Sequence, residues 1–210
     1  MPNSAAPKDT PKARRTRRLI LDTAMRLFAE LGYERAGNAA IAEAAGITRG
    51  AMLYYYSTRE ALVAAAATHI QAARTALFEE AIRQHGGVGD AVDLAIETYW
   101  QLLPTEPFQA FRELENAARL DPKVAEAIAP AQAEFDGAAM GQSVPGLIQA
   151  GADPRFQVSR DLARFALEGL HHARLTYRDQ ERATALIRVL KRAVHMLNRK
   201  GDVQDLWPGS

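Results

Sequence analysis

Apolar side chains recur every three to four positions along most of this chain, which is the spacing of one face of an α-helix. The clearest stretch covers residues 12–31 and stops at Gly32, a residue type that terminates helices well. Proline, glycine and N-cap signals divide the remaining pattern into eight further helices. We expect them at residues 38–45, 49–55, 58–84, 90–103, 107–119, 122–139, 156–177 and 179–200.

The connecting segments contain no alternation of apolar and polar residues long enough for a strand, and the chain has no internal repeat of 20–50 residues. The fold class is therefore predicted to be all-α with about nine helices. Ser57 and Glu60 form an S-x-x-E pattern, which predicts a capping box at the start of the long helix 58–84.

Composition excludes several classes of protein. The 210 residues include no cysteine, so a disulfide framework, a thiolate metal site and a cysteine nucleophile are all ruled out. The longest stretch without charge, residues 137–152, is broken by proline and glycine and is shorter than the roughly 20 apolar residues of a membrane helix. We expect a soluble, cytoplasmic protein.

The charges are unevenly distributed although the whole chain carries a net charge of only +1. Residues 1–60 contain ten basic and six acidic side chains, so the remainder is slightly acidic. A basic N-terminal part is typical of a segment that binds a polyanion such as nucleic acid, and also of a solvated tail.

The spacing of Ala42, Gly46 and Met52 is that of a helix-turn-helix. Ala42 is small enough for a second helix to cross it, and Gly46 suits the left-handed conformation of the turn. Ile41, Ile47 and Met52 supply the apolar contacts between the two helices. A recognition helix fixed in this way can enter the major groove of DNA with its first residues at the base edges.

The predicted recognition helix carries hydroxyl and guanidinium groups that suit a DNA surface. The hydroxyls of Thr48 and Tyr55 can donate to phosphate oxygens, and Arg49 can pair with phosphate or a guanine edge. Helical spacing puts Tyr56 in the core and Tyr54 and Tyr55 outside. We therefore expect DNA contacts from the recognition region and from a basic arm that includes Lys12 and precedes the first helix. These residues are Thr48, Arg49, Gly50, Ala51, Tyr54, Tyr55 and Arg59, together with Arg14, Arg15, Arg17 and Arg18 of the arm.

Three blocks of sequence together resemble the N-terminal domain of TetR-family (tetracycline-repressor-like) transcriptional regulators. The blocks are Leu19–Ala24 with Leu27–Tyr33, then Ile41–Gly50, then Ser57–Leu62, at the expected distances from one another. The resemblance covers residues 15–62. It implies a DNA-binding domain over residues 1–57 and an effector-binding and dimerisation domain over residues 58–210.

The chain departs from the family pattern at several positions of this domain. Tyr55 replaces the usual histidine, Leu53 replaces a common tyrosine, and Ala36 replaces a threonine that caps the first helix of the motif. Asn38 is a good N-cap residue type and can take over that last role. These changes affect individual phosphate contacts rather than the expected DNA-binding role.

The last two predicted helices carry dense apolar stripes, which can pack in the protein's own core or against a second copy. The resemblance implies that the pair forms a four-helix interface in a homodimer. The interface residues that we expect are Leu162, Phe165, Ala166, Gly169, Leu186, Leu190, Val194 and Leu197. A dimer also suits a helix-turn-helix, because it places two recognition helices on a palindromic site.

Aromatic and polar residues in the middle helices are candidates for a ligand pocket, although aromatic residues on helices are usually core. The candidates are Tyr99, Trp100, Phe108, Phe111, Arg112, Glu115, Asn116, Phe135 and His171. His171 and His172 point in different directions on a helix, so one of them is expected to be exposed. We expect no bound metal, no cofactor and no catalytic residue, since none of the common enzyme motifs is present.

The sequence thus favours a ligand-responsive DNA-binding regulator. We expect a repressor that binds a palindromic operator as a homodimer and is released by a small, largely apolar effector. Two alternatives remain at this point: a constitutive DNA-binding protein without an effector, and an all-α enzyme or carrier that merely contains a helical hairpin.

Overall fold

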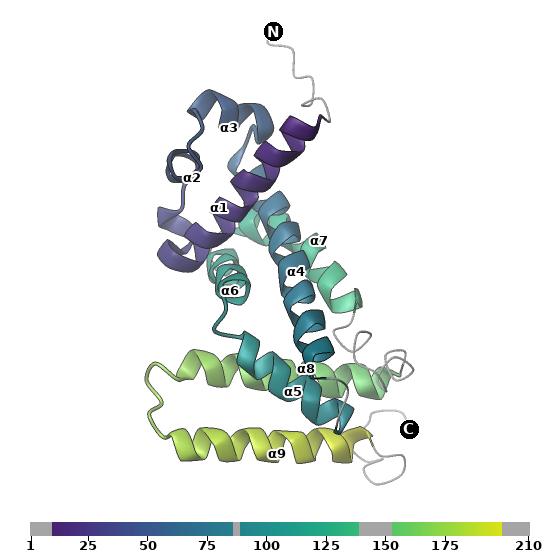
Figure 1. Ribbon diagram of the computed structural model, residues 1–210. Coiled ribbons are helices and arrows are strands. Elements are labelled where there is room, and N and C mark those ends of the chain that lie inside the picture. Colours follow the sequence, from purple (N-terminus) through teal and green to yellow (C-terminus); the bar gives the residue numbers. More distant parts are fainter. Residues whose placement is uncertain (1–9, 86–88, 139–152, 199–210) are drawn as a thin grey trace. The chain divides into compact units, whose positions relative to one another are not determined.

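The computed structural model describes residues 10–85, 89–138 and 153–198, and these residues form helices joined by short connections (Figure 1). The helices are α1 (Pro11–Arg35), α2 (Asn38–Ala44), α3 (Arg49–Tyr55), α4 (Arg59–Gln84), α5 (Ala91–Leu102), α6 (Glu106–Ala118), α7 (Pro122–Ala138), α8 (Pro154–Ala173) and α9 (Gln180–Asn198). The all-α prediction is confirmed for the described part of the chain, where no strand occurs.

Most helix ends follow from local chemistry that the sequence displays. Asp90 caps α5 by accepting hydrogen bonds from the backbone N–H groups of Val92 (2.9 Å) and Asp93 (3.1 Å). Gly32, with φ 75°, interrupts the helical conformation near the end of α1, as its position after the apolar repeat predicts.

Several predicted helix ends are shifted; α1, for example, continues past Gly32 to Arg35. Two of the shifts have a clear local reason. The cap of α4 is Thr58 rather than Ser57, because the Thr58 hydroxyl accepts the N–H of Ala61 at 3.0 Å. Helix α8 ends at Ala173 instead of residue 177, because the Ala173 carbonyl accepts hydrogen bonds from the backbone of Thr176 and Tyr177 and closes a turn.

The chain divides into two compact units. The first comprises Met1–Ala76 with Pro104–Gly137, and the second comprises Leu77–Leu103 with Ala138–Ser210. These units reflect packing, whereas the boundary predicted after residue 57 separates functions, so that functional division stays a prediction. Helix α4 contributes its first part to one unit and its last two turns to the other.

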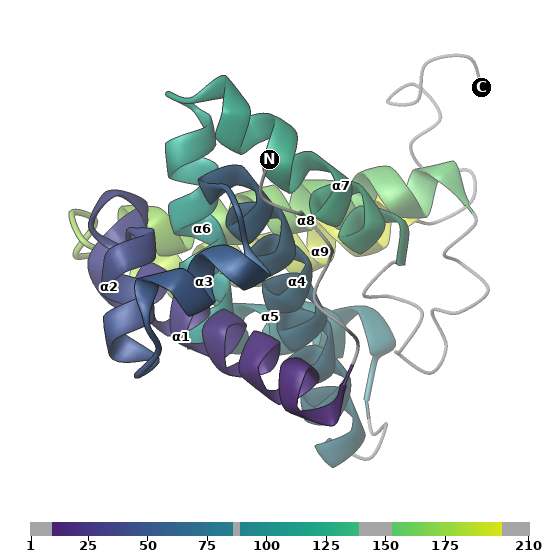
Figure 2. The ribbon, with the colours of Figure 1, turned by 90° about the horizontal axis from the view of Figure 1, so that it is seen from above.

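In the first unit, α1 packs against α2 and along α6, and α2 packs against α3 (Figure 1). Figure 2, turned by 90°, again shows α1, α2 and α3 grouped together. Their shared core consists of large side chains with almost no exposed surface. Among its members are Ile20, Phe28, Ile41, Met52, Leu62, Ile70, Phe111 and Leu114. This core holds the helix-turn-helix in place.

In the second unit, α8 and α9 run side by side, and α5 packs against both of them (Figure 1). The buried side chains of this unit include Phe78 at the end of α4, Leu94 and Tyr99 on α5, and Phe156 and Leu167 on α8. Helix α9 buries only Val194 fully, so most of its apolar residues remain partly or largely exposed.

Candidate nucleic-acid interface and ligand pocket

Local hydrogen bonds hold the turn between α2 and α3. The N–H of Gly46 donates to the Glu43 carbonyl and that of Ile47 donates to the Ala42 carbonyl, both at 3.0 Å. Gly46 has φ 66°, the left-handed conformation predicted from its position. Thr48 then caps α3 by accepting the N–H of Ala51 at 3.1 Å, which fixes the start of the recognition helix.

Helix α3 is anchored on one side and exposed on the other. Met52 is buried and Tyr56, directly after the helix, is 8% exposed. On the other side Arg49 and Gly50 are exposed, and Tyr54 is 55% exposed. The predicted inward position of Tyr56 and outward position of Tyr54 are therefore confirmed.

Tyr55 lies at the edge of this exposed surface and is half-buried. Its ring meets that of Tyr54 edge to face at 5.3 Å between centroids. The guanidinium carbon of Arg17 lies 5.9 Å from the centre of the Tyr55 ring. The α1 and α3 side chains proposed for DNA binding thus meet at this point.

The predicted basic arm is not a segment that precedes the first helix. Helix α1 begins at Pro11 with Thr10 as its N-cap, so Arg14, Arg15, Arg17 and Arg18 all lie on it. Arg14, Arg15 and Arg18 are exposed, and Arg17 is half-buried. The correction matters because a helix holds these charges in fixed directions, which a flexible tail does not.

Arg59 is engaged inside the first unit. Its guanidinium donates to the Tyr33 carbonyl at 3.0 Å and to Asn38 Oδ1 at 3.3 Å. It also lies over the rings of Tyr33 and Phe28, at 4.6 and 5.4 Å from their centres. The capping role predicted for Asn38 is wrong, because Asn38 is the first residue of α2 and the N-cap position is Gly37. Gly37 has no side chain to accept a cap hydrogen bond, and the Asn38 side chain binds Arg59 instead.

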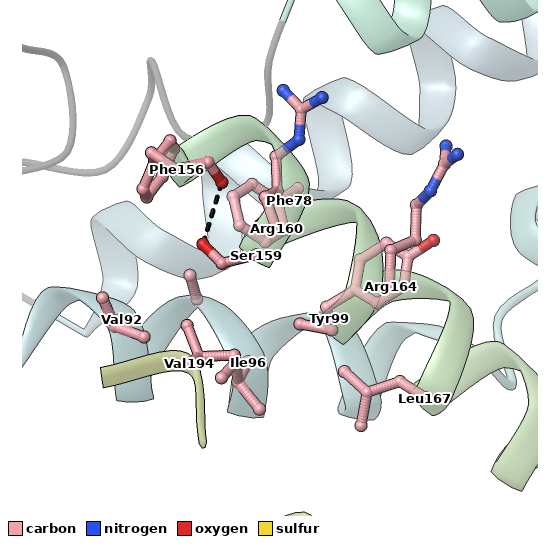
Figure 3. Close-up of a pocket in the computed structure, with 12 residues that line it drawn as sticks. Phe78, Val92, Ile96, Tyr99, Phe156, Ser159, Arg160, Arg164, Leu167 and Val194 are labelled. Carbon is pink, nitrogen blue, oxygen red and sulfur yellow. Dashed lines mark hydrogen bonds between the residues drawn. The ribbon is translucent and has the colours of Figure 1, made fainter. Parts of the chain in front are cut away.

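A pocket opens within the second unit between α5, α8 and α9 (Figure 3). Its empty volume is about 520 Å³, counting the space that opens to solvent. Most of the lining side chains are apolar. The lining comprises Phe78, Val92, Ala95, Ile96, Tyr99, Phe156, Ser159, Arg160, Ala163, Arg164, Leu167 and Val194.

The uncharged polar groups of the lining already have partners in the protein. The Tyr99 hydroxyl donates to Glu168 Oε1. The Ser159 hydroxyl lies 3.0 Å from both the Phe156 carbonyl and Asn198 Oδ1. The walls of the pocket therefore suit an apolar ligand surface.

Among the residues predicted for a ligand pocket, Tyr99 is the one that lines this cavity. Trp100 and His171 lie in the same unit and meet edge to face at 6.1 Å between ring centroids. His171 is buried while His172 is exposed, as their spacing predicts. The other candidates, Phe108, Phe111, Arg112, Glu115, Asn116 and Phe135, belong to the first unit.

Three of those aromatic candidates surround a residue of the chain itself. The guanidinium carbon of Arg74 lies 4.5, 5.1 and 4.3 Å from the ring centres of Phe108, Phe111 and Phe135. Arg74 also donates to Gln71 Oε1 at 2.9 Å. The aromatic side chains that the sequence offers as pocket walls thus pack around an internal cation.

The polar candidates of the first unit lie nearer its surface. Arg112 is half-buried and donates to Gln109 at 3.1 Å, whereas Glu115 and Asn116 are exposed. The sequence missed Phe78, Val92 and Phe156 as pocket residues. They belong to the apolar faces of the end of α4, of α5 and of the start of α8, and in the sequence these faces cannot be distinguished from ordinary core.

The predicted interface residues on α8 and α9 are mostly solvent-accessible. Leu162, Phe165 and Leu186 are 48%, 59% and 47% exposed. Ala166 and Gly169 are also exposed, Leu190 and Leu197 are half-buried, and Val194 is buried in the pocket wall. Val189 and Met196, which the sequence did not single out, are more than half exposed. Large apolar side chains thus recur along both helices.

One group in the described part of the chain has the composition of a metal site. Ligand atoms of Asp90, Asp93 and His195 lie within 4.8 Å of one another. His195 Nε2 lies 3.0 Å from Asp93 Oδ1 and 3.3 Å from Asp90 Oδ1, so these residues join α5 to α9 by direct contacts. The Lys191 amino group, 4.0 Å from Asp93, adds a positive charge that disfavours a cation there.

In the ranges that the structure describes, no helix combines the length and the apolar character needed to cross a membrane.

Comparison with known proteins identifies the N-terminal segment. Residues 20–66 match the sequence profile of the family described as bacterial regulatory proteins, tetR family. This match spans α2, α3 and parts of α1 and α4, which include the whole helix-turn-helix. No curated protein sequence matches the chain.

Solved structures share the fold over most of the chain. A TetR-family member from Streptomyces coelicolor A3 is 22% identical, with a TM-score of 0.59 over 84% of this chain and 96% of that one. A TetR-family regulator from Marinobacter aquaeolei VT8 is 16% identical, with a TM-score of 0.53 over 87% and 96%. The multidrug binding protein EbrR complexed with proflavin is 22% identical, with a TM-score of 0.56 over 84% and 98%.

Proposed function

Because residues 20–66 belong to the tetR family of bacterial regulatory proteins, we propose that this chain is a ligand-released transcriptional repressor that binds a palindromic operator as a homodimer. The observation that carries the proposal is the exposed face of α3. Its capped start, buried Met52 and outward Arg49 and Tyr54 are the features of a recognition helix that enters the major groove.

The contacts to DNA divide into two kinds. Arg49 and Gly50, at the first turn of α3, are in position to approach base edges, with Thr48 and Ala51 beside them. Tyr54 and Tyr55, together with Arg14, Arg15, Arg17 and Arg18 of α1, contact phosphates. Arg59 supports the DNA-binding helices indirectly in this proposal, because it ties the end of α1 to the start of α4.

Dimerisation through α8 and α9 is supported by the apolar residues that these helices leave exposed. Leu162 and Phe165 on α8, and Leu186 and Val189 on α9, are each 47–63% exposed. A second copy that covers them removes this apolar surface from water. The small exposed residues Ala166 and Gly169 allow the helices of two copies to approach closely.

The effector binds in the second unit and is largely apolar, as the lining of the pocket suggests. The solved relative EbrR supports ligand binding in proteins of this fold, since its structures were determined in complex with proflavin and with imidazole. Helix α4 links the two functions, because it starts beside the DNA-binding helices and contributes Phe78 to the pocket lining.

Release from DNA is a shift between two conformers. The effector binds more tightly to a conformer in which α4 is displaced and the two recognition helices no longer match half-sites about 34–36 Å apart. An effector with equal affinity for both conformers leaves operator affinity unchanged. The protein acts in the cytoplasm and has no enzymatic role in this proposal.

The proposal is tested by selecting genomic DNA fragments with the purified full-length chain and sequencing what is retained. A repressor of this kind enriches a small set of fragments that share one palindrome. Retention of all fragments alike would instead favour the constitutive, sequence-independent DNA-binding protein. Retention of none at low salt would favour an all-α enzyme or carrier.

A further inference from the structure

The charged side chains of the pocket lining are both cations. They are Arg160 and Arg164, which lie four residues apart on α8 and therefore on the same face of the helix. Figure 3 shows that both side chains run away from Val92, Ile96 and Val194 and end with their guanidinium groups on one side of α8. Their aliphatic stems form part of the apolar wall. The guanidinium carbon of Arg164 lies 4.6 Å from the centre of the Phe165 ring, which is outside the lining.

The neighbouring acidic groups lie outside the lining and have partners of their own. Asp161 Oδ1 accepts hydrogen bonds from Arg160 Nε at 3.1 Å and Nη2 at 2.9 Å. Glu168 accepts the hydroxyl of Tyr99. Arg160 therefore gives two of its five N–H donors to a single carboxylate oxygen, and its side chain keeps 19% of its surface exposed.

From this arrangement we infer that the pocket takes an amphipathic anion, an aliphatic or aromatic carboxylate whose apolar body enters the cavity while its carboxylate pairs with Arg160 and Arg164. The inference depends on the proposed function in one respect: it takes this ligand to be the effector that releases the protein from DNA. A carboxylate suits a pair of guanidinium groups because it accepts two parallel N–H···O bonds from one guanidinium and is attracted by both charges.

The interior of the pocket explains why the charge of the ligand belongs beside the two arginines. The Tyr99 and Ser159 hydroxyls are used within the protein, and the remaining lining is aliphatic or phenyl surface. A charged group buried against such walls would lose its hydration without compensation. A neutral ligand makes no use of the two arginines.

The experiment measures binding of three ligands of equal chain length, octanoate, 1-octanol and octylamine, to the full chain by isothermal titration calorimetry. We expect octanoate to bind at least about tenfold more tightly than octanol, because it alone gains charge-assisted hydrogen bonds, and octylamine to bind least. Equal or tighter binding of octanol or octylamine would overturn the inference. This comparison uses the wild-type chain and does not depend on how a variant folds.

A second measurement places the carboxylate. The double variant Arg160→Gln with Arg164→Gln is expected to lose about tenfold or more in octanoate affinity while octanol affinity stays the same. Arg188→Gln, which removes an exposed arginine of α9 outside the lining, serves as the matched control. Octanoate binding that is unchanged in the double variant would place the carboxylate elsewhere and refute the proposed site.

Operator binding is then measured with and without octanoate, which separates the two proposals. Octanoate that binds through the arginines but leaves operator affinity unchanged would support the ligand class and contradict ligand release. Failure of octanoate to bind a chain that still recognises an operator would refute the ligand class and leave the DNA-binding proposal intact.

Discussion

The guanidinium of Arg59 lies over the ring of Tyr33, with its central carbon 4.6 Å from the ring centre, and donates a 3.0 Å hydrogen bond to the Tyr33 carbonyl. This contact joins the first turn of α4 to the end of α1. Arg59→Ala is therefore expected to lower the free energy of unfolding by about 2 kcal/mol, through loss of a charge-assisted hydrogen bond and of stacking on two rings.

Urea denaturation of the full chain measures this effect. Arg35→Ala is the matched control, since Arg35 is exposed and bonds only locally to the Leu31 carbonyl. That variant should change stability by no more than about 0.5 kcal/mol. Equal stability of the two variants would mean that Arg59 contributes little to the fold and is available for DNA, as the sequence suggests.

Gly46 adopts a conformation that other residues enter only at a cost. With φ 66° in the turn between α2 and α3, Gly46→Ala is expected to cost about 1 kcal/mol of stability, although no atom stands within 4 Å of the added methyl group. Gly50 lies within α3, where alanine is favoured over glycine, so Gly50→Ala should instead raise the free energy of unfolding by about 0.5 kcal/mol. Thermal unfolding of both variants checks the pair, and a shift of the same sign in both would contradict this account of the turn.

Burial raises the pKa of the Tyr56 hydroxyl above its ordinary value, and the nearby charge of Arg17 only partly offsets this effect. The unfolded chain therefore loses this proton first, at about pH 10, while the folded chain retains it. The free energy of unfolding should therefore fall as the pH rises above about 10. Tyr56→Phe has no ionisable hydroxyl at this position, so it should not show the part of the fall that is due to Tyr56. Urea denaturation at about pH 8 and pH 10.5 compares the two proteins. An identical pH dependence in both would contradict the buried position of this hydroxyl.

Phe165 is the most exposed of the predicted interface residues that are large and apolar. Phe165→Glu puts a charge into the proposed dimer interface and is expected to produce a monomer at micromolar concentration. Leu120→Glu is the control, because Leu120 is 75% exposed in the connection between α6 and α7. Size-exclusion chromatography with light scattering gives the mass of each variant. A dimeric Phe165→Glu protein would place the interface on another surface.

The helix-turn-helix was predictable because its constraints are local. Gly46, Thr48 and Met52 each act within a few residues of the chain, through a turn, a cap and an anchor, and the sequence displays all three. Tyr56 could be assigned to the core from helical spacing alone. The basic residues of α1 were placed on an arm, although the predicted helix already begins at residue 12, because residues 12–18 contain no large apolar side chain that would mark a buried face.

The ligand pocket was not predictable in the same way, because it depends on which helices pack together. Phe108, Phe111 and Phe135 are aromatic residues on middle helices, as a pocket lining would require, yet they surround Arg74 in the first unit. Arg59 illustrates the same limit, since its partner Tyr33 lies 26 residues away in the sequence. Periodicity gives the buried face of a helix but not the identity of the facing helix.

The central claim is that α3 reads a specific DNA site, and fluorescence anisotropy tests it most directly. Binding of wild type, Arg49→Ala, Tyr55→Phe and the exposed control Arg35→Ala is measured on the selected palindrome and on a scrambled duplex, each at two salt concentrations. The account predicts tight, salt-sensitive binding to the palindrome. Arg49→Ala should lose about 1–3 kcal/mol of binding free energy, and Tyr55→Phe about 1 kcal/mol, both without loss of fold. Arg35→Ala should bind like wild type. Equal affinity of the wild type for both duplexes, or wild-type binding by Arg49→Ala, would contradict the assignment of α3 as the recognition helix.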